Sequence, residues 1–474
     1  MEGLSPQRER HDEHGSVPSH AFPDSLPSPL WTGAAMTTQA KPPGSPRQPG
    51  APALAVLFLI VFINLAGFGL VAPLLPFFAK TLDAQAWQIA LMFAAYSFGQ
   101  FFSEPFTGRL SDQIGRKPVL LATLGVNTLG YIALAFAPDI WFAIVVRLFT
   151  GLGSGNIAVI QGYVADVTPP ERRAARMGLV GAAFGLGFIL GPGLGGLLTQ
   201  PQLGHVGYQL PIFLAAALAA LAAVGVIFFL GESRIRGAVP PRRSPFLSGL
   251  HEARDNPVVS RLLVVTLIYL AGFSAMESVF ALWAEGRYGW GPREVGLSFM
   301  IVGLVSALNQ GLFTGRLARR FGETRVLATG MLVYGSSLIL QAALPAAWFP
   351  ALRLDLGLFV LPVVQGWIIP LVMAFGAFGM SIAMPNISAM ISRSAPPERQ
   401  GAMLGLNMAS GSASRIFGPI AAGALFSGLG HDWPLVIGGL LTIPAAVMAV
   451  NAGRALRRNE AVTKTPDLST SPAE

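Results

Sequence analysis

Long apolar stretches separated by short polar segments make up most of the chain. Most of these stretches reach about 20 residues, the length that an α-helix needs to cross the hydrocarbon core of a bilayer. Continuous apolar runs predict helices, whereas the strands of a membrane barrel would alternate apolar and polar positions. The pattern predicts twelve spans: 52–79, 85–107, 118–137, 140–164, 174–199, 208–230, 258–284, 292–314, 326–345, 362–391, 399–426 and 433–453.

The longest polar interruption, residues 231–257, divides these spans into six and six. The two halves also share sequence: Pro169–Arg172, followed by Gly191-Pro192, recurs 227 residues later as Pro396–Arg399 and Gly418-Pro419. Such a repeat is typical of transporters whose binding site lies between related bundles near the bilayer midplane. The predicted parts are a disordered tail (1–50), a six-helix bundle (51–230), a cytoplasmic linker (231–257), a second six-helix bundle (258–455) and a cytoplasmic tail (456–474).

The N-terminal tail mixes Pro, Ser, Gly and both charge signs without apolar periodicity, which is typical of disorder. Nothing before Pro52 resembles the apolar core of a signal peptide. Met36 begins a shorter tail, and we expect it to be the true start of translation.

The composition agrees with a polytopic membrane protein. Of the 474 residues, 52% are hydrophobic and 12% charged, and the mean hydropathy of +0.56 lies outside the range of soluble domains. With no cysteine, disulfides, thiolate metal sites and thiol catalysis are excluded. The six histidines lie in tails or predicted loops without metal-ligand spacing, so we expect no metal site and no cofactor.

Basic residues indicate the orientation. Most of the 32 lysines and arginines fall in the tails and in alternate loops, which the positive-inside rule assigns to the cytoplasm. This asymmetry predicts that both termini are cytoplasmic, and it explains the net charge of +8 without nucleic acid. The exceptions are Arg147 and Arg415 within spans, and Lys80, Arg287, Arg293 and Arg353 in outer loops.

A charged hinge joins the second and third spans. It runs from Gly108 to Leu121 and holds four charged residues, Arg109, Asp112, Arg116 and Lys117. The hinge resembles the signature G-x-L-S-D-x-x-G-R-[RK]-P of the major facilitator superfamily of secondary transporters. The resemblance implies the major facilitator fold and a gating ion-pair cluster that also includes Asp166 and Glu171; topology-setting charges with weak surface pairing are the alternative.

Charged side chains within spans are functional candidates because they are costly in lipid. Arg147, in the fourth span, begins a stretch similar to the family motif R-x-x-Q-G-x-G, whose arginine is linked to proton transfer, with Thr150 at the Gln position. Glu277 and Glu104 are carboxyls that can carry a proton if they move between water and apolar surroundings. Arg147, Glu277 and Glu104 are the predicted proton-coupling residues.

The fifth span is rich in glycine, which lets helices approach closely, and contains a proline that permits bending. Ordinary helix packing would suffice to explain these residues. The run nevertheless resembles G-x-x-x-G-P-x-x-G-G, the signature of drug-exporting antiporters of the superfamily. The predicted packing hinge consists of Gly187, Gly191, Pro192, Gly195 and Gly196.

The first span, from Asn64 to Pro76, is similar to the opening helix of tetracycline exporters and related drug:H⁺ antiporters. Those exporters carry an aspartate at the position of Asn64, which cannot titrate. Either Glu104 or Glu277 then couples the proton, or the substrate differs. The predicted cavity residues are Asn64, Arg415 and Gln310.

The sequence therefore predicts an all-α inner-membrane transporter with twelve helices in two pseudo-symmetric bundles. We expect proton-coupled efflux of amphipathic, tetracycline-like or multidrug substrates by alternating access. A sugar or metabolite facilitator without proton coupling is the first alternative, and a non-transporting membrane sensor is a distant one. No nucleotide loop or nucleophile motif indicates an enzyme. The expected partners are a small-molecule substrate, protons and lipid; the chain is expected to be a monomer.

Overall fold

The computed structural model describes residues 51–233, 246–355, 360–396 and 399–464. The predicted tail 1–50 and much of the predicted linker lie outside these ranges, as does the expected start at Met36. The first half contains α1 (Ala51–Val71), η1 (Ala72–Leu74), α2 (Leu75–Lys80), α3 (Ala86–Ile114), α4 (Arg116–Ala135), α5 (Ile140–Leu152), α6 (Asn156–Val167), α7 (Pro170–Leu198), η2 (Pro201–Leu203) and α8 (Val206–Phe229).

The second half adds helices and one short hairpin. Its elements are α9 (Phe246–Asp255), α10 (Pro257–Tyr288), α11 (Pro292–Leu312), α12 (Thr314–Phe321), α13 (Glu323–Ala343), η3 (Ala346–Trp348), β1 (Leu352–Asp355), β2 (Val360–Val363), α14 (Ile369–Ser394), α15 (Gln400–Gly428) and α16 (Trp433–Lys464). Within the described residues, ten segments are long and apolar enough to cross a membrane. Helices α3 and α15 have 29 residues each and complete the twelve predicted spans.

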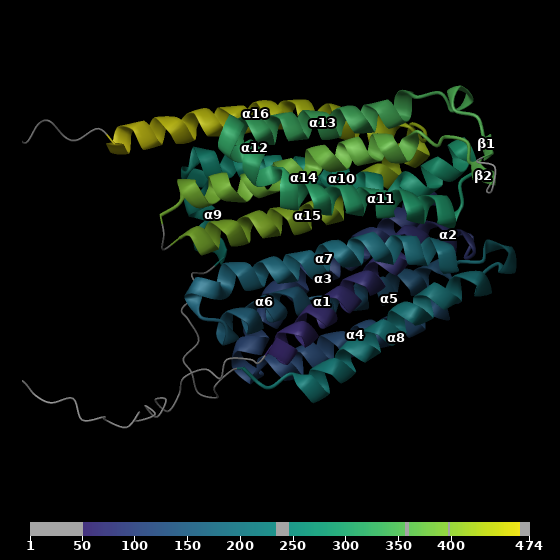
Figure 1. Cartoon of the computed structure of the whole chain (residues 1–474), viewed down its shortest axis with the longest axis horizontal. Helices are drawn as coiled ribbons and strands as arrows, with labels where there is room; N and C mark the ends of the chain where they lie inside the picture. The colour runs from purple at the N-terminus through teal and green to yellow at the C-terminus, as the bar shows by residue number, and fades with distance from the viewer. Residues whose placement is uncertain (1–50, 234–245, 356–359, 397–398, 465–474) are drawn as a thin grey trace, which may run out of the picture. The chain divides into compact units, whose positions relative to one another are not determined.

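The helices pack as two groups that meet along two helix pairs (Figure 1). In the first group α1 packs on α7 and α8, and α4 on α5 and α8. In the second, α10 packs on α15 and α16, and α13 on α14 and α16. The pairs α3–α15 and α7–α11 join the groups. The first group consists of helices that precede residue 231, and the second of helices that follow residue 245.

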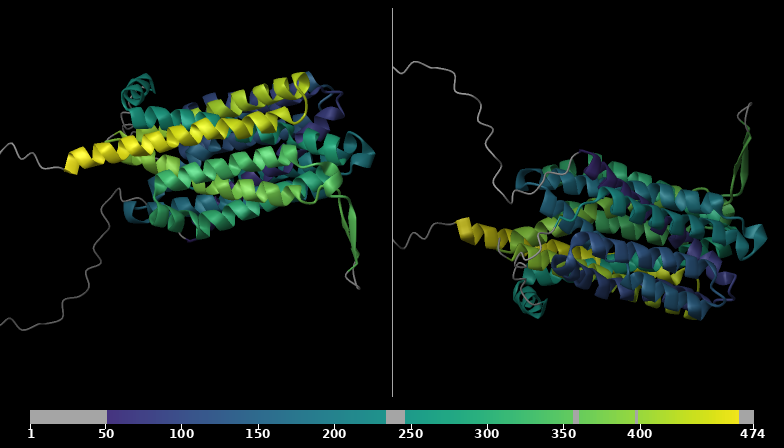
Figure 2. Two further views of the ribbon diagram at one scale, coloured as in Figure 1. Left: turned by 90° about the horizontal axis from the view of Figure 1, so that it is seen from above. Right: turned by 90° about the horizontal axis from the view of Figure 1, so that it is seen from below.

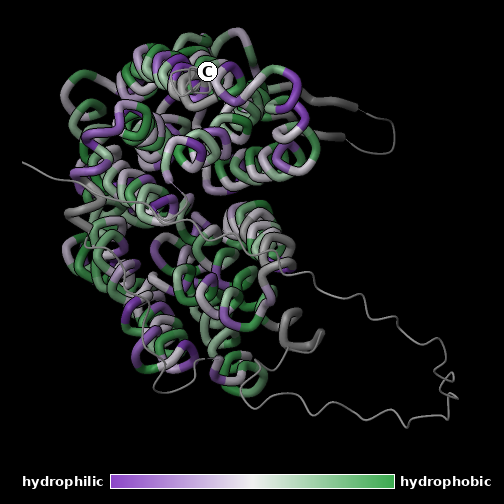
Figure 3. The backbone as a smooth tube through the Cα atoms, turned by 90° about the vertical axis from the view of Figure 1, so that its left-hand side faces the viewer, coloured by the Kyte–Doolittle hydropathy of each residue, from purple (hydrophilic) through white to green (hydrophobic). Residues whose placement is uncertain are grey.

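Large apolar side chains cover the outside of the helices. Leu129 is 68% exposed and Phe228 75% exposed, and many more apolar residues stand free on other helices. A soluble monomer rarely exposes so much contiguous apolar surface, whereas lipid tails are a suitable solvent for it. Figure 3 views the helices end-on and shows apolar residues along most of them.

Several helix limits differ from the predicted spans. The fourth span is broken between α5 and α6, where the run Gly153–Gly155 supplies two glycines that weaken a helix. Helix α16 continues to Lys464, through part of the predicted tail, and α9 lies within the predicted linker. Charged residues follow the apolar part of α16, and the apolar pattern alone does not show where such a helix ends.

The hairpin β1–β2 was not predicted. The tenth span was expected to start at residue 362, but β2 covers Val360–Val363 and α14 begins at Ile369. The two strands are antiparallel, with Leu352 opposite Val363 and Asp355 opposite Val360. A short apolar run can form a strand or a helix, and in β2 the β-branched residues Val360 and Val363 favour the strand. The hairpin projects away from the helices (Figure 2).

We call the end at which α7 begins and α16 finishes the inner end, and the opposite end the outer end. Helices α7 and α11 touch at the outer end: a Cβ atom on Gly296 would lie 2.4 Å from the Pro192 carbonyl oxygen. Further inward, a Cβ on Gly185 would lie 3.6 Å from Ala307, and one on Gly181 would meet nothing within 4 Å. The two helices therefore separate toward the inner end.

The outer end also holds an ion pair between the two groups. Lys80, at the end of α2, lies 2.5 Å from Glu285 of α10. Close by, a Cβ on Gly423 of α15 would lie 2.6 Å from Ala90 of α3. Both helix pairs that join the groups are thus closed at this end.

Candidate functional site

Arg147 is the most deeply buried charge in the described part of the membrane-spanning region. It lies in the second half of α5, before the break that separates α5 from α6, and is 2% exposed. Its guanidinium lies 4.0 Å from the centre of the Tyr96 ring on α3. The Nε atom has no hydrogen-bond partner among the described residues. Cation–π stacking on an aromatic face stabilises a desolvated guanidinium and leaves its N–H groups available to a ligand.

Two carboxyls from different halves lie in the field of the same arginine. Glu277 of α10 interacts electrostatically with both Arg415 and Arg147. Glu104 of α3 interacts with Arg415, accepts a hydrogen bond from Gln100 Nε2 at 3.1 Å and bonds the side chain of Ser412. Because Arg415 and Ser412 belong to α15, these contacts cross the α3–α15 interface.

A cavity lies beside these charges. It is lined by residues of α1, α3, α4, α6 and α7 from the first half, and by Arg415 from the second. Phe68 stands 5.7 Å from Tyr96 and 6.2 Å from Phe188, ring centre to ring centre, so aromatic faces form one side. The polar lining residues are Asn64, Tyr96, Gln100, Asn127, Tyr131, Ser154, Asn156 and Arg415. Aromatic walls with a few polar groups suit an amphipathic small molecule.

The structure brings most of the predicted site residues together, with one exception. Asn64 and Arg415 line the cavity, and Arg147, Glu277 and Glu104 are linked to it through Tyr96 and Arg415. Gln310 is exposed on α11 and does not line this cavity.

The charged hinge forms a buried cluster around Arg116, which is 5% exposed. Its guanidinium pairs with Asp112 at 2.7 Å and with Asp166 at 2.9 Å, and donates to Ser111 Oγ at 2.6 Å. A Cβ atom on Gly162 would lie 2.6 Å from the guanidinium carbon, so a glycine is needed there. All of these partners belong to the first half.

The other predicted members of the cluster lie apart from Arg116 or cannot be placed. Lys117 Nζ donates to the Ile227 carbonyl at 2.7 Å, and Arg109 is exposed. The side chain of Glu171 is outside the described residues. Glu232 was not predicted: its carboxylate accepts from the amides of Arg116 and Lys117 at 2.9 and 3.1 Å.

The predicted hinge glycines of α7 lie on two contact faces. Cβ atoms on Gly187, Gly191 and Gly195 would lie within 2.9 Å of α1, and one on Gly196 would lie 2.5 Å from the Pro292 carbonyl of α11. Helix α7 therefore packs closely on its own bundle and on the other bundle at once.

Sequence reasoning missed most of the aromatic and polar cavity residues, because neutral residues within apolar spans give no distinctive signal. Tyr96 could have been found only by its helical register with Gln100 and Glu104, three residues spaced four apart. Among the described residues, no group of His, Asp and Glu side chains could hold a metal ion.

The geometry can be compared with known proteins. A family model described as Major Facilitator Superfamily matches residues 57–377 and 311–472. The chain belongs to the Major Facilitator Superfamily. It is 31% identical to the class C tetracycline resistance protein of Escherichia coli over 413 residues, which cover 86% of this chain and 96% of that protein. It is 28% identical to multidrug resistance protein 2 of Bacillus subtilis, over 82% of this chain and 92% of that protein.

Solved structures of the family share the fold. A bacterial homologue of the human lysosomal transporter Spinster, in an inward-facing and unoccupied conformation, matches with a TM-score of 0.69 and 14% identity, over 86% of this chain and 97% of that chain. The predicted family and the predicted helical membrane fold are thus confirmed. The protein is a multi-pass membrane transporter of small molecules.

Proposed function

We propose that the protein exports amphipathic drugs, tetracycline-like or multidrug substrates, in exchange for protons. The observation that carries the proposal is the arrangement of Glu277 and Glu104 around Arg415, next to a cavity with aromatic walls. The tetracycline and multidrug resistance relatives support the substrate class. We also propose an inner-membrane location with both termini in the cytoplasm, since basic residues concentrate at the inner end.

In the proposed cycle the two carboxyls compete for Arg415. A proton from the outside neutralises Glu277, and Arg415 then pairs more strongly with Glu104 across the α3–α15 interface. With the inner end open, where α7 and α11 are apart, Glu277 releases its proton to the cytoplasm and substrate enters from the same side, and substrate binding favours closure of the inner end. Substrate then leaves to the outside, and uptake of the next proton by Glu277 from that side restores the starting arrangement.

A facilitator without proton coupling is the alternative function, and Asn64 is the observation that favours it. Asn64 lines the cavity and cannot titrate, so no ionisable group of α1 takes part in coupling. The glycine-rich α7 supports export through its resemblance to drug antiporters.

Drug-triggered proton movement in inverted vesicles distinguishes the two functions. The expected result is that tetracycline or ethidium releases protons with the native protein, and that Glu277→Gln or Glu104→Gln abolishes this release. Arg320→Gln, an exposed charge at the inner end, is the control and should release protons normally. Transport that persists without proton movement in the native protein would establish the facilitator.

A further inference from the structure

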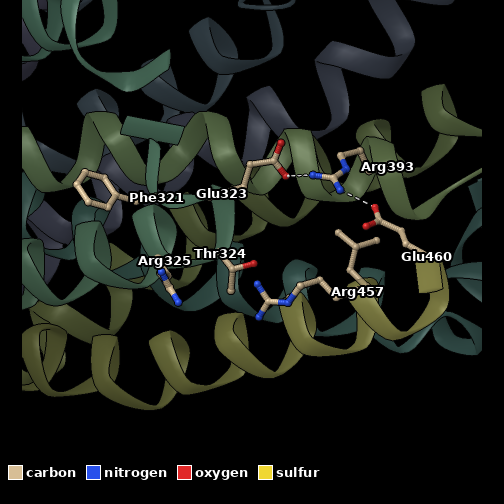
Figure 4. A pocket seen from close by; sticks show the side chains of 10 residues that line it. Phe321, Glu323, Thr324, Arg325, Arg393, Arg457 and Glu460 are labelled. Carbon is tan, nitrogen blue, oxygen red and sulfur yellow. Dashed lines mark hydrogen bonds and ion pairs between the residues drawn. The ribbon is translucent and has the colours of Figure 1, made fainter. Parts of the chain in front are cut away.

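A second cavity, of about 220 Å³, opens at the inner end of the second half. It lies between the start of α13 and the last turns of α16. None of its lining residues lines the central cavity. Its lining residues are Phe321, Gly322, Glu323, Thr324, Arg325, Arg393, Gly453, Leu456, Arg457 and Glu460 (Figure 4).

The charges of this cavity do not balance locally. Arg393 pairs with both glutamates, at 2.9 Å from Glu323 and 2.5 Å from Glu460. Arg325 and Arg457 are exposed to the cavity and have no carboxylate partner among the described residues. The two unpaired guanidiniums give the cavity a positive potential and suit a planar oxyanion.

The start of α4, in the first half, is the counterpart of the start of α13 and binds a carboxylate. Gly115 precedes α4 with φ of 110°, and Gly322 precedes α13 with φ of 83°. The two glycines correspond in sequence, because Gly108-Arg109-Leu110 with Gly115 recurs 207 residues later as Gly315-Arg316-Leu317 with Gly322. At Gly115 the Glu232 carboxylate caps the helix, and a Cβ there would lie 2.5 Å from its Oε2 atom. At Gly322 a Cβ would meet nothing within 4 Å.

Within the described part of the chain, the first amides of α13 therefore have no carboxylate in the position that Glu232 takes at α4. Among the described residues no side chain accepts a hydrogen bond from the first amides of α13, and its first-turn acid, Glu323, is paired with Arg393. These amides and the helix dipole favour negative charge as those of α4 do. Thr324, in the first turn of α13, is 9% exposed and lines the cavity, and its hydroxyl has no hydrogen bond among the described residues. In Figure 4 the hydroxyl points toward the Arg457 guanidinium.

We propose that this cavity binds a phosphate-class oxyanion in the position that the Glu232 carboxylate takes in the first half. Arg325 and Arg457 neutralise the anion, and the Thr324 hydroxyl and the first amides of α13 donate to it. An anionic phospholipid headgroup and free inorganic phosphate share this chemistry. A basic pocket between helices at the cytoplasmic membrane surface is suited to the lipid.

Thermal unfolding of the purified full-length protein tests the site. Phosphatidylglycerol should raise the unfolding midpoint of the native protein, and phosphatidylcholine should not. Arg325→Gln combined with Arg457→Gln should weaken the phosphatidylglycerol effect at least tenfold in apparent affinity. Arg454→Gln combined with Arg458→Gln removes the same charge from neighbouring positions that do not line the cavity, and should behave as the native protein does.

A separate arm distinguishes the two sources of the anion. Inorganic phosphate at constant ionic strength should compete with phosphatidylglycerol; if phosphate alone gives the full midpoint shift, free phosphate is the ligand. Thr324→Val keeps both cations and should weaken binding severalfold, so it tests the site even if the double variant does not fold. Equal responses of the native protein and these variants, or an equal response to phosphatidylcholine, would overturn the proposal.

Discussion

A single arginine shows how this chain keeps a charge in the membrane-spanning region. Arg147 has no ion pair among the described residues; it is stabilised by its position over the Tyr96 ring and by the more distant charge of Glu277. A desolvated cation–π contact contributes about 2 kcal/mol, less than the cost of burying the charge. The remaining cost is consistent with a group that gains a partner when substrate binds.

Replacing Arg147 by lysine should therefore impair transport. An ammonium keeps the charge but loses the planar contact with Tyr96 and the free Nε–H group. We expect at least a tenfold lower rate of drug-driven proton release in inverted vesicles. Tyr96→Phe keeps the aromatic face and should retain most of the rate. A native rate with Arg147→Lys would show that charge alone is needed.

Gly162→Ala should destabilise the first half. The new Cβ would occupy the place of the Arg116 guanidinium, which two carboxylates and Ser111 hold in position. The side chain must then give up part of this buried network, at a cost of ~1–3 kcal/mol in unfolding free energy. Gly178→Ala, where nothing lies within 4 Å, is the matched control and should change stability little. Unfolding in a denaturing detergent gives the comparison.

At the scale of elements, α7 is the helix whose packing most depends on small residues. Gly195 lies against α1 and Gly196 against α11, both with a virtual Cβ within 2.5 Å of a backbone oxygen. Backbone atoms cannot yield as a flexible side chain can. A substitution at Gly195 should therefore disturb packing within the first bundle, whereas one at Gly196 should disturb contact between the two bundles.

Gly196→Val should weaken closure of the outer end while leaving the first bundle folded. We expect a longer distance between the outer ends of α7 and α11 and slower transport, with little loss of helix content. Gly195→Val acts against α1 and should instead lower the stability of the first bundle. Distance measurements between spin labels, together with circular dichroism, separate the two effects. Identical behaviour of the two variants would contradict the assignment of faces.

The elements also show how far the sequence could predict this protein. Apolar runs indicate segments surrounded by lipid, and basic loops indicate segments in water on the cytoplasmic side. The helices and their grouping were therefore predictable. The hairpin at residues 352–363 was not, because a short apolar run fits several structures. The Glu232 cap joins residues 116 apart in sequence, and no local pattern reveals such a contact. The central charges were predicted individually, but their link through Tyr96 and Arg415 depends on how the helices pack.

At the scale of the whole transporter, the two bundles meet at the outer end, and helices α7 and α11 separate toward the inner end. The contacts that close the outer end are the glycine-mediated approaches of α7 to α11 and α15 to α3, and the Lys80–Glu285 ion pair. The helix contacts depend on shape, whereas the ion pair depends on charge and on salt. The pair is therefore the component that can be changed without altering the packing.

Glu285→Gln should shift the protein toward a state that is open at the outer end. The side chains of Lys80 and Glu285 are 47% and 32% exposed, so the pair stabilises closure by ~0–1 kcal/mol, and its loss changes the ratio of states at most about fivefold.

Because the chain has no cysteine, spin labels can be placed directly with Leu203→Cys and Leu429→Cys, both exposed near the outer end. The longer distance should gain population in Glu285→Gln and in Lys80→Gln, and in the native protein at high salt. The exchanged pair, Lys80→Glu with Glu285→Lys, should restore the native distribution; if both single variants keep that distribution, the pair has no part in closing the outer end.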